Sequence, residues 1–131
     1  MAGLTLVGAI ALPQAAANLS VPDSARGNYM ESGRACYGML TITAQRITWI
    51  TPFSECRSSP YAIRDSQDGS TGLRITYELM QPSEKCRYRV LVLTHMASSE
   101  NVIGWNVVGY PSLDSAARGR SADALGCYLY R

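Results

Sequence analysis

Apolar and polar residues alternate with a period of two along much of residues 36–131, and this alternation constrains the fold more than any other feature. It is clearest over residues 73–80, where every second residue from Leu73 to Leu79 is apolar. A period of two predicts β-strands that bury one face and expose the other. The pattern predicts strands over residues 36–43, 46–51, 61–64, 73–80, 86–94, 102–108 and 127–131.

Segments rich in Gly, Pro, Ser and Asp separate these strands. We expect a loop over residues 52–60 and an exposed turn over residues 65–72. One short helix is expected near residues 113–118, because Ser112 is a typical N-cap and Gly119 a typical stop. Strands joined by short connections favour an antiparallel meander, and a long sheet tends to close and remove its edges. The expected fold is all-β, a small antiparallel meander barrel or a strongly curved sheet.

The four cysteines are too far apart in the chain for a Cys-x-x-Cys redox or zinc motif. Because His95 is the only histidine, a mixed Cys and His zinc site would need distant ligands. Two structural disulfides are therefore the favoured interpretation, with three connectivities open. Closing the barrel would place the last strand beside the first, which favours Cys36–Cys127 and leaves Cys56 to pair with Cys86.

The first 17 residues have the pattern of an export signal. The apolar run Leu4–Leu12 is shorter than the roughly 20 residues that span a bilayer, and Ala15–Ala17 offers the small residues of a cleavage site. No Lys or Arg precedes the run, so a start further upstream or a buried N-terminal element stays open. We expect a signal peptide at 1–17, an irregular segment at 18–35 and a disulfide-linked barrel domain at 36–131, in a periplasmic or secreted protein.

Charge and side-chain chemistry argue against several classes of function. A formal net charge of +2 is too small to argue for nucleic acid or an anionic membrane surface, and no later segment is apolar enough to predict a membrane span. The lone His95 gives no sign of a base beside a nucleophile. Most carboxylates fall in predicted turns, whereas Glu78 lies within a strand and is expected to pair with Arg74, Arg87 or Arg89. We expect no metal, no cofactor and no enzymatic activity, and the oligomeric state stays open.

Four aromatic residues on different predicted strands are candidates for binding a ligand. They are Trp49, Tyr77, Tyr88 and Trp105. If they share the interior face, they could line a pocket at the mouth of a barrel. The alternative is that they fill a small core.

Part of the sequence resembles small exported bacterial proteins with a lipocalin-like barrel. The resemblance is carried by Cys-Tyr-Gly-Met-Leu-Thr-Ile-Thr at 36–43, Arg-Ile-Thr-Trp at 46–49, Cys56 and Pro-Tyr at 60–61. In addition, Gly-Asn-Tyr at 27–29 is similar to the Gly-x-Trp that opens lipocalin barrels. The resemblance implies this fold and a periplasmic setting. Lysozyme-inhibitor proteins share the broad build, but their inhibitory loop has no match here and no functional residue is carried over.

Three functions of different classes follow from these observations. The favoured one is a non-enzymatic exported domain that binds or inhibits a protein partner through a Tyr/Arg-rich face, since both residue types are enriched at interface hot spots. The alternative is a carrier of a small apolar ligand in the barrel interior, which would need a cavity of several hundred cubic ångströms. An enzyme of unknown class is the least favoured.

Overall fold

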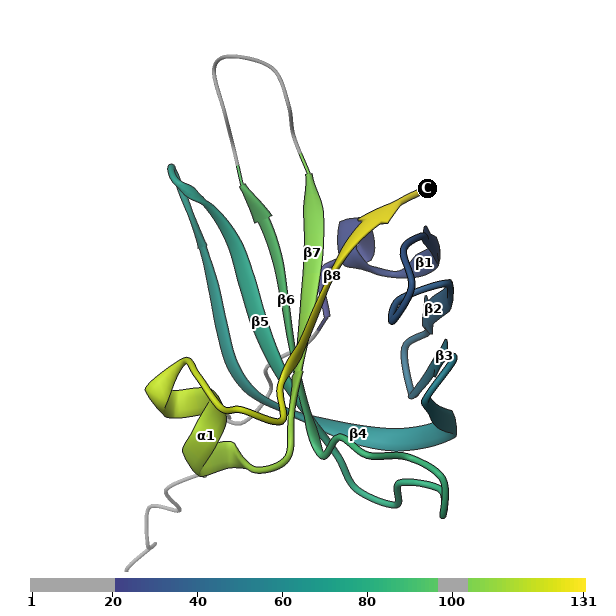
Figure 1. Cartoon of the computed structure of the whole chain (residues 1–131). Coiled ribbons are helices and arrows are strands. Elements are labelled where there is room, and N and C mark those ends of the chain that lie inside the picture. The colour runs from purple at the N-terminus through teal and green to yellow at the C-terminus, as the bar shows by residue number, and fades with distance from the viewer. Residues whose placement is uncertain (1–20, 97–103) are drawn as a thin grey trace, which may run out of the picture.

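A computed structural model describes residues 21–96 and 104–131. In this part of the chain, antiparallel strands form a closed barrel in which each strand pairs with the next and the last pairs with the first (Figure 1). The all-β barrel expected from the sequence is thus confirmed. The predicted signal at 1–17 and most of the turn expected between β6 and β7 lie outside the described residues. The strands are β1 (Gly27–Glu31), β2 (Gly38–Ile42), β3 (Arg46–Thr51), β4 (Ser54–Gly69), β5 (Gly72–Leu79), β6 (Val90–Met96), β7 (Trp105–Tyr110) and β8 (Leu125–Tyr130).

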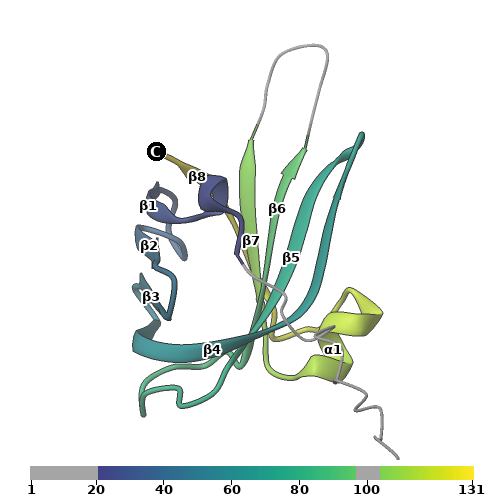
Figure 2. The same ribbon diagram turned by 180° about the vertical axis from the view of Figure 1, so that it is seen from behind.

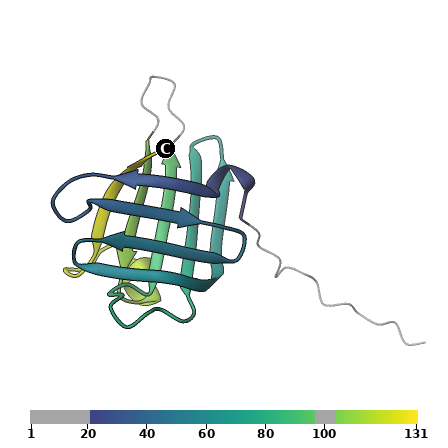
Figure 3. The same ribbon diagram turned by 90° about the vertical axis from the view of Figure 1, so that its right-hand side faces the viewer.

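Two layers of strands face each other across the core. In Figure 3 the layer formed by β1, β2, β3 and the start of β4 crosses in front of the strands from β5 to β8. Figure 2 shows β4 passing from the β3 side of the barrel to the β5 side, so this strand belongs to both layers. Its pairing register shifts between Ile47 and Trp49 on β3 and between Ile63 and Asp65 on β4 itself. Such irregularities let a strand bend sharply at the corner of a barrel.

The long strand β4 corrects the prediction of a loop at 52–60, a short strand at 61–64 and an exposed turn at 65–72. The polar residues of 65–72 belong to a β4–β5 hairpin that is largely exposed near its tip, so they face solvent without leaving the ladder. Pro60 is tolerated close to the register shift, although proline cannot donate a ladder hydrogen bond. Composition alone therefore predicted a loop and a turn where the chain forms a largely polar strand.

The segment 18–35, expected to be irregular, contains strand β1. Tyr29 and Glu31 are its inward residues, and a buried carboxylate at the second position hides the apolar alternation that marks a strand. A smaller correction concerns the strand predicted at 86–94, which begins at Val90 because the preceding residues form the β5–β6 connection. The strand predicted at 102–108 is described as β7, from Trp105 to Tyr110.

The short helix occupies the residues that the sequence predicts. Helix α1 (Leu113–Arg118) begins at Ser112, whose side chain accepts a hydrogen bond from the backbone N–H of Ser115, and ends at Gly119 in the left-handed conformation with φ of 73°. It covers the outer side of β6 and β7, where Val90, Val92, Tyr110 and Ala116 form a small second core. A 3-10 helix, η2 (Asp23–Ala25), precedes β1.

The barrel interior is filled with large side chains. The largest that are fully buried are Tyr29, Leu40, Ile42, Ile47, Trp49, Ile75, Tyr77, Leu79, Leu91 and Leu93. Gly109 on β7 makes this packing possible, because a Cβ there would lie 2.5 Å from Trp49 Cζ3 and 2.8 Å from Tyr88 Cγ. Both rings can therefore lie against the backbone of β7.

We predict that Gly109→Ala lowers the free energy of unfolding by about 1–3 kcal/mol, because the added methyl group overpacks the site between two rings. The matched control is Gly126→Ala, where the nearest atom to a new Cβ is Val108 Cγ2 at 3.7 Å, and a change within about 0.5 kcal/mol is expected. Urea denaturation of the oxidised protein measures both. Equal effects of the two substitutions would contradict the close packing described for Gly109.

Candidate functional site

Both disulfides lie at the same end of the barrel. In an antiparallel meander the connections β1–β2, β3–β4, β5–β6 and β7–β8 all gather at one end, and three of them are residues 32–37, 52–53 and 80–89. The Cys36–Cys127 bridge joins the first of these to the start of β8, and Cys56–Cys86 joins the start of β4 to the β5–β6 connection. We call these connections, with the segment around α1, the disulfide-braced end.

The disulfides have the pairing that closure of the barrel predicts. In the chain-entropy description, loops with sequence separations of 91 and 30 residues stabilise the fold by about 4.5 and 3.5 kcal/mol. No free cysteine is present among the described residues. The main effect at this end is that connections without regular structure are held in place.

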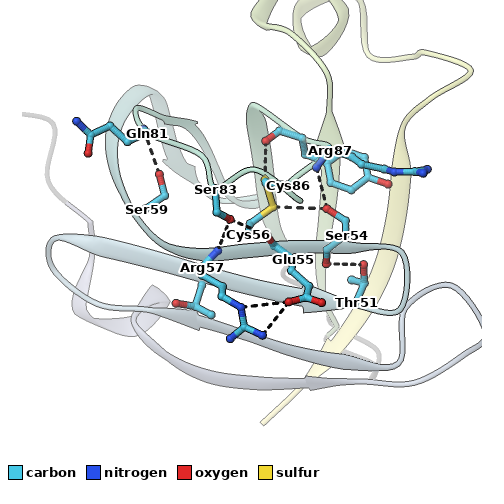
Figure 4. The surroundings of a disulfide bond; sticks show 12 residues. Thr51, Ser54, Glu55, Cys56, Arg57, Ser59, Gln81, Ser83, Cys86 and Arg87 are labelled. Atoms are coloured by element: carbon cyan, nitrogen blue, oxygen red, sulfur yellow. Dashed lines mark hydrogen bonds and ion pairs between the residues drawn. A yellow bond between two sulfur atoms is a disulfide. The ribbon is translucent and has the colours of Figure 1, made fainter.

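Serine hydroxyls fix the β5–β6 connection along β4, as Figure 4 shows around Cys56–Cys86. Their hydrogen bonds replace the regular backbone pairing that the connection lacks. The contacts are Arg87 N–H to Ser54 Oγ at 2.9 Å, Arg57 N–H to Ser83 Oγ at 3.0 Å, Ser83 Oγ–H to the Glu55 carbonyl at 2.7 Å and Gln81 N–H to Ser59 Oγ at 3.3 Å. Backbone groups of both segments are satisfied in this way without a further strand.

Two open cavities meet at Arg87 on the disulfide-braced end. One has a volume of about 330 Å³ and is bordered by Phe53, Glu55 and Lys85 among others. The second has a volume of about 480 Å³ and lies between Tyr88 and the segment that follows α1. Phe53 is 66% exposed at the tip of the β3–β4 turn. The site thus offers an exposed aromatic ring, a guanidinium and two hollows on rigid connections.

The charges around these cavities are of both signs. Glu55 and Arg57 share one face of β4, with Arg57 Nη2 at 2.8 Å from Glu55 Oε1. The hydrogen bond from Arg57, followed by its charge, lowers the pKa of the Glu55 carboxyl. Glu84, Lys85 and Arg87 add further exposed charges. A mixed rim suits contact with polar and charged groups rather than an extended polyanion.

The four aromatic candidates do not converge on one pocket. Trp49 and Tyr88 pack together with ring centroids 5.2 Å apart, whereas Tyr77 packs on Tyr61 at 5.1 Å. Trp105 packs elsewhere, at 5.4 Å from Tyr29, and is stacked on His95. Trp49, Tyr77 and Tyr88 belong to the buried core and Trp105 packs against it. Tyr88 is the one of the four that also borders a described cavity.

The ion pair expected for Glu78 has a different main partner. Its carboxylate lies 2.6 Å from Arg64 Nη2 and 3.7 Å from Arg89 Nε. Arg89 was among the expected partners, whereas Arg64 was not. Ala62 lies opposite Glu78 in the β4–β5 pair, and Arg64 follows two residues later. Alternation within one strand does not show which strand lies beside it.

Glu31 is the buried ionisable residue that the sequence analysis did not single out. Its side chain is 2% exposed, and its Oε1 accepts a hydrogen bond from Trp49 Nε1 at 2.5 Å. Its Oε2 is buried and has no hydrogen-bond partner within residues 21–96 and 104–131. Burial raises the pKa of Glu31 from 4.5 to about 7, against the smaller opposing effect of the Trp49 hydrogen bond. The only available signal in the sequence was an acidic residue two positions after Tyr29 at the end of a short alternating run.

Comparison of the chain with models of protein families, with curated proteins and with solved structures finds no match. Within residues 21–96 and 104–131, no three His, Cys, Asp or Glu side chains gather as a metal site would require. Over the same residues, no helix reaches the length and apolarity needed to cross a bilayer. The functional argument therefore depends on the geometry of this structure.

We predict that Ser54→Ala lowers the free energy of unfolding by about 1 kcal/mol, because the Arg87 N–H loses its acceptor beside the Cys56–Cys86 bridge. Amide hydrogen exchange at Arg87 should also become faster. The control is Ser70→Ala, in the exposed β4–β5 turn, with an expected change within about 0.5 kcal/mol. Unchanged exchange at Arg87 in the Ser54 variant would show that this hydroxyl does not hold the connection.

The raised pKa of Glu31 predicts that the protein loses stability as the pH rises from about 4.5 to about 7. In this window the folded state keeps a proton that the unfolded chain has released, so the free energy of unfolding falls, by on the order of 3 kcal/mol in total. Glu31→Gln keeps an acceptor for Trp49 and should remove most of this fall. Urea denaturation at a series of pH values measures it, and a Glu31→Gln curve parallel to that of the native chain would contradict the assignment.

Proposed function

We propose that this protein binds a protein partner through its disulfide-braced end and has no catalytic role. The observation that carries the proposal is the meeting of two open cavities at Arg87, beside the exposed ring of Phe53, on connections fixed by both disulfides. Aromatic side chains and arginine are the residue types that most often dominate binding energy at interfaces.

Rigidity of the connections supports this proposal. A loop that is already fixed in its bound conformation loses little entropy on association, and more of the contact energy then appears as affinity. The bridges and the hydroxyl contacts of Ser54 and Ser83 supply such preorganisation. The partner expected here offers an apolar side chain for a cavity and a carboxylate for Arg87.

Packing of the barrel interior argues against the carrier alternative. A carrier of an apolar ligand needs interior space, whereas Trp49, Tyr77 and Leu79 are among many side chains that are fully buried there. The disulfides favour an oxidising compartment as the place of action, and a periplasmic or secreted location is part of the proposal.

The test is an affinity experiment with the immobilised, oxidised protein and extracytoplasmic or culture proteins, read by mass spectrometry. A recovered partner is then purified and its affinity measured for Phe53→Ser and Arg87→Ala, each of which should weaken binding by more than about tenfold. Both side chains are exposed, so the fold should be unaffected.

The matched control is Met39→Thr on β2, which changes a second exposed apolar area formed by Met30, Met39 and Tyr130. Its affinity for the partner should stay within about twofold of the native value. Loss of binding in the Met39 variant but not in the Phe53 and Arg87 variants would place the interface elsewhere. Recovery of a lipid-like molecule in place of a protein would favour the carrier.

A further inference from the structure

The pairing between β1 and β8 is the shortest joint of the barrel. It consists of two residue pairs, Met30 with Tyr130 and Glu31 with Leu129. By comparison, β1 and β2 form five pairs along the whole of β1. We call the β1–β8 joint the seam. Because few ladder bonds hold it, local opening of the barrel should cost least there.

Two tethers connect the strands beside the seam. The Cys36–Cys127 disulfide links the residues that follow β1 to β8. Beyond β8, the Arg131 guanidinium donates hydrogen bonds to the carbonyl oxygens of Ser24 and Arg26 and lies 4.8 Å from the centroid of the Tyr29 ring. These tethers would keep β1 and β8 close to each other even if the ladder between them opened.

Glu31 is one of the two β1 residues of the seam, and its carboxyl points into the barrel. Among the residues that the structure describes, one oxygen has Trp49 Nε1 as its only partner and the other has none. Trp49 is itself 1% exposed, so the hydrogen bond lies deep in the core. A neutral carboxyl is tolerable in such a place, whereas an unpaired carboxylate is costly because it loses its hydration.

Among the described residues, no cation forms an ion pair with Glu31. Strand β2 carries no titratable side chain, and the groups on the other elements around Glu31 are exposed or make contacts elsewhere. Arg131, which follows β8, already contacts Ser24 and Tyr29. The groups concerned are Tyr29 on β1, Arg34 and Tyr37 before β2, Arg46 on β3, Tyr88 before β6, and Tyr128, Tyr130 and Arg131 at the end of the chain.

We infer that ionisation of Glu31 opens the seam between β1 and β8, so that the barrel carries a proton-controlled gate to its interior. Separation of the two strands would give water access to the Glu31 carboxylate, since Glu31 itself lies in the joint. The opened seam uncovers Tyr29 and Leu129, which are buried in the closed barrel. Protonation closes it again, and the two tethers guide the strands back into register.

The direction of the effect follows from the burial of Glu31. Its pKa in the closed barrel is about 7, compared with 4.5 when the carboxyl is hydrated. The closed state is therefore favoured below pH 4.5, and opening increases as the pH rises through this window. Each pH unit within it multiplies the open fraction by up to about tenfold.

Hydrogen exchange of the full, oxidised chain between pH 4.5 and 8.5 tests this inference, after correction for the intrinsic rate at each pH. Met30 and Tyr130 form the pair whose backbone hydrogen bonds cross the seam. Protection of their amides should fall by more than about tenfold between pH 5 and 7.5. Protection of Tyr77 and Leu91, in the β5–β6 pair, should stay higher throughout than that of the seam. The two strand pairs thus separate local opening from global unfolding.

Two variants complete the test. Glu31→Gln should keep the seam protected up to pH 8, since it removes the charge and keeps an acceptor for Trp49. Glu78→Gln, which removes a carboxyl that is paired with Arg64 on the outer face, should leave the pH dependence of the seam as in the native chain. The inference is overturned if seam protection does not change with pH, if Glu31→Gln leaves its pH dependence intact, or if the seam and the β5–β6 pair are equally protected at every pH.

Discussion

Close packing around Trp49 is the constraint on which the rest of the structure depends. Its indole lies against Tyr88, leaves no room for a side chain at Gly109, and donates its N–H to Glu31. One side chain from β3 thereby contacts β1, β7 and the β5–β6 connection, which are far apart in sequence. A void or a larger side chain at this point would disturb the packing of both layers, because protein interiors are packed as densely as organic crystals.

The same packing connects the interior to the disulfide-braced end. Tyr88 rests on Trp49 on one side and borders an open cavity on the other, next to Arg87. The position of the proposed interface is therefore set by the core as well as by the Cys56–Cys86 bridge. Ser54 adds to this by accepting a hydrogen bond from the backbone N–H of Arg87, whose side chain is exposed.

The parts of this fold that were predictable from sequence are those where one local pattern decides the outcome. Alternation from Leu73 to Leu79 places four side chains in the core, and Ser112 with Gly119 defines the helix α1. Strand β4 was not predictable in this way, because it is largely polar, contains Pro60 and shifts register twice against its neighbours. Glu31 was hidden for a related reason, since a carboxyl at an inward position is the opposite of what a strand pattern shows. The cavities at Arg87 depend on how three connections meet, and no single segment contains that information.

The bridges are nested: the first cysteine is joined to the fourth and encloses the pair formed by the second and third. If the chain is oxidised while it emerges from a translocation channel, Cys36 and Cys56 are the first two cysteines to be exposed, and they are not disulfide partners. Cys127 arrives only with the last strand. Correct cross-linking must therefore wait until the polypeptide has been delivered almost completely, or early mispaired bonds must be exchanged by a thiol catalyst. In the proposed export, maturation of this small barrel would depend on the order in which its ends reach the oxidising side.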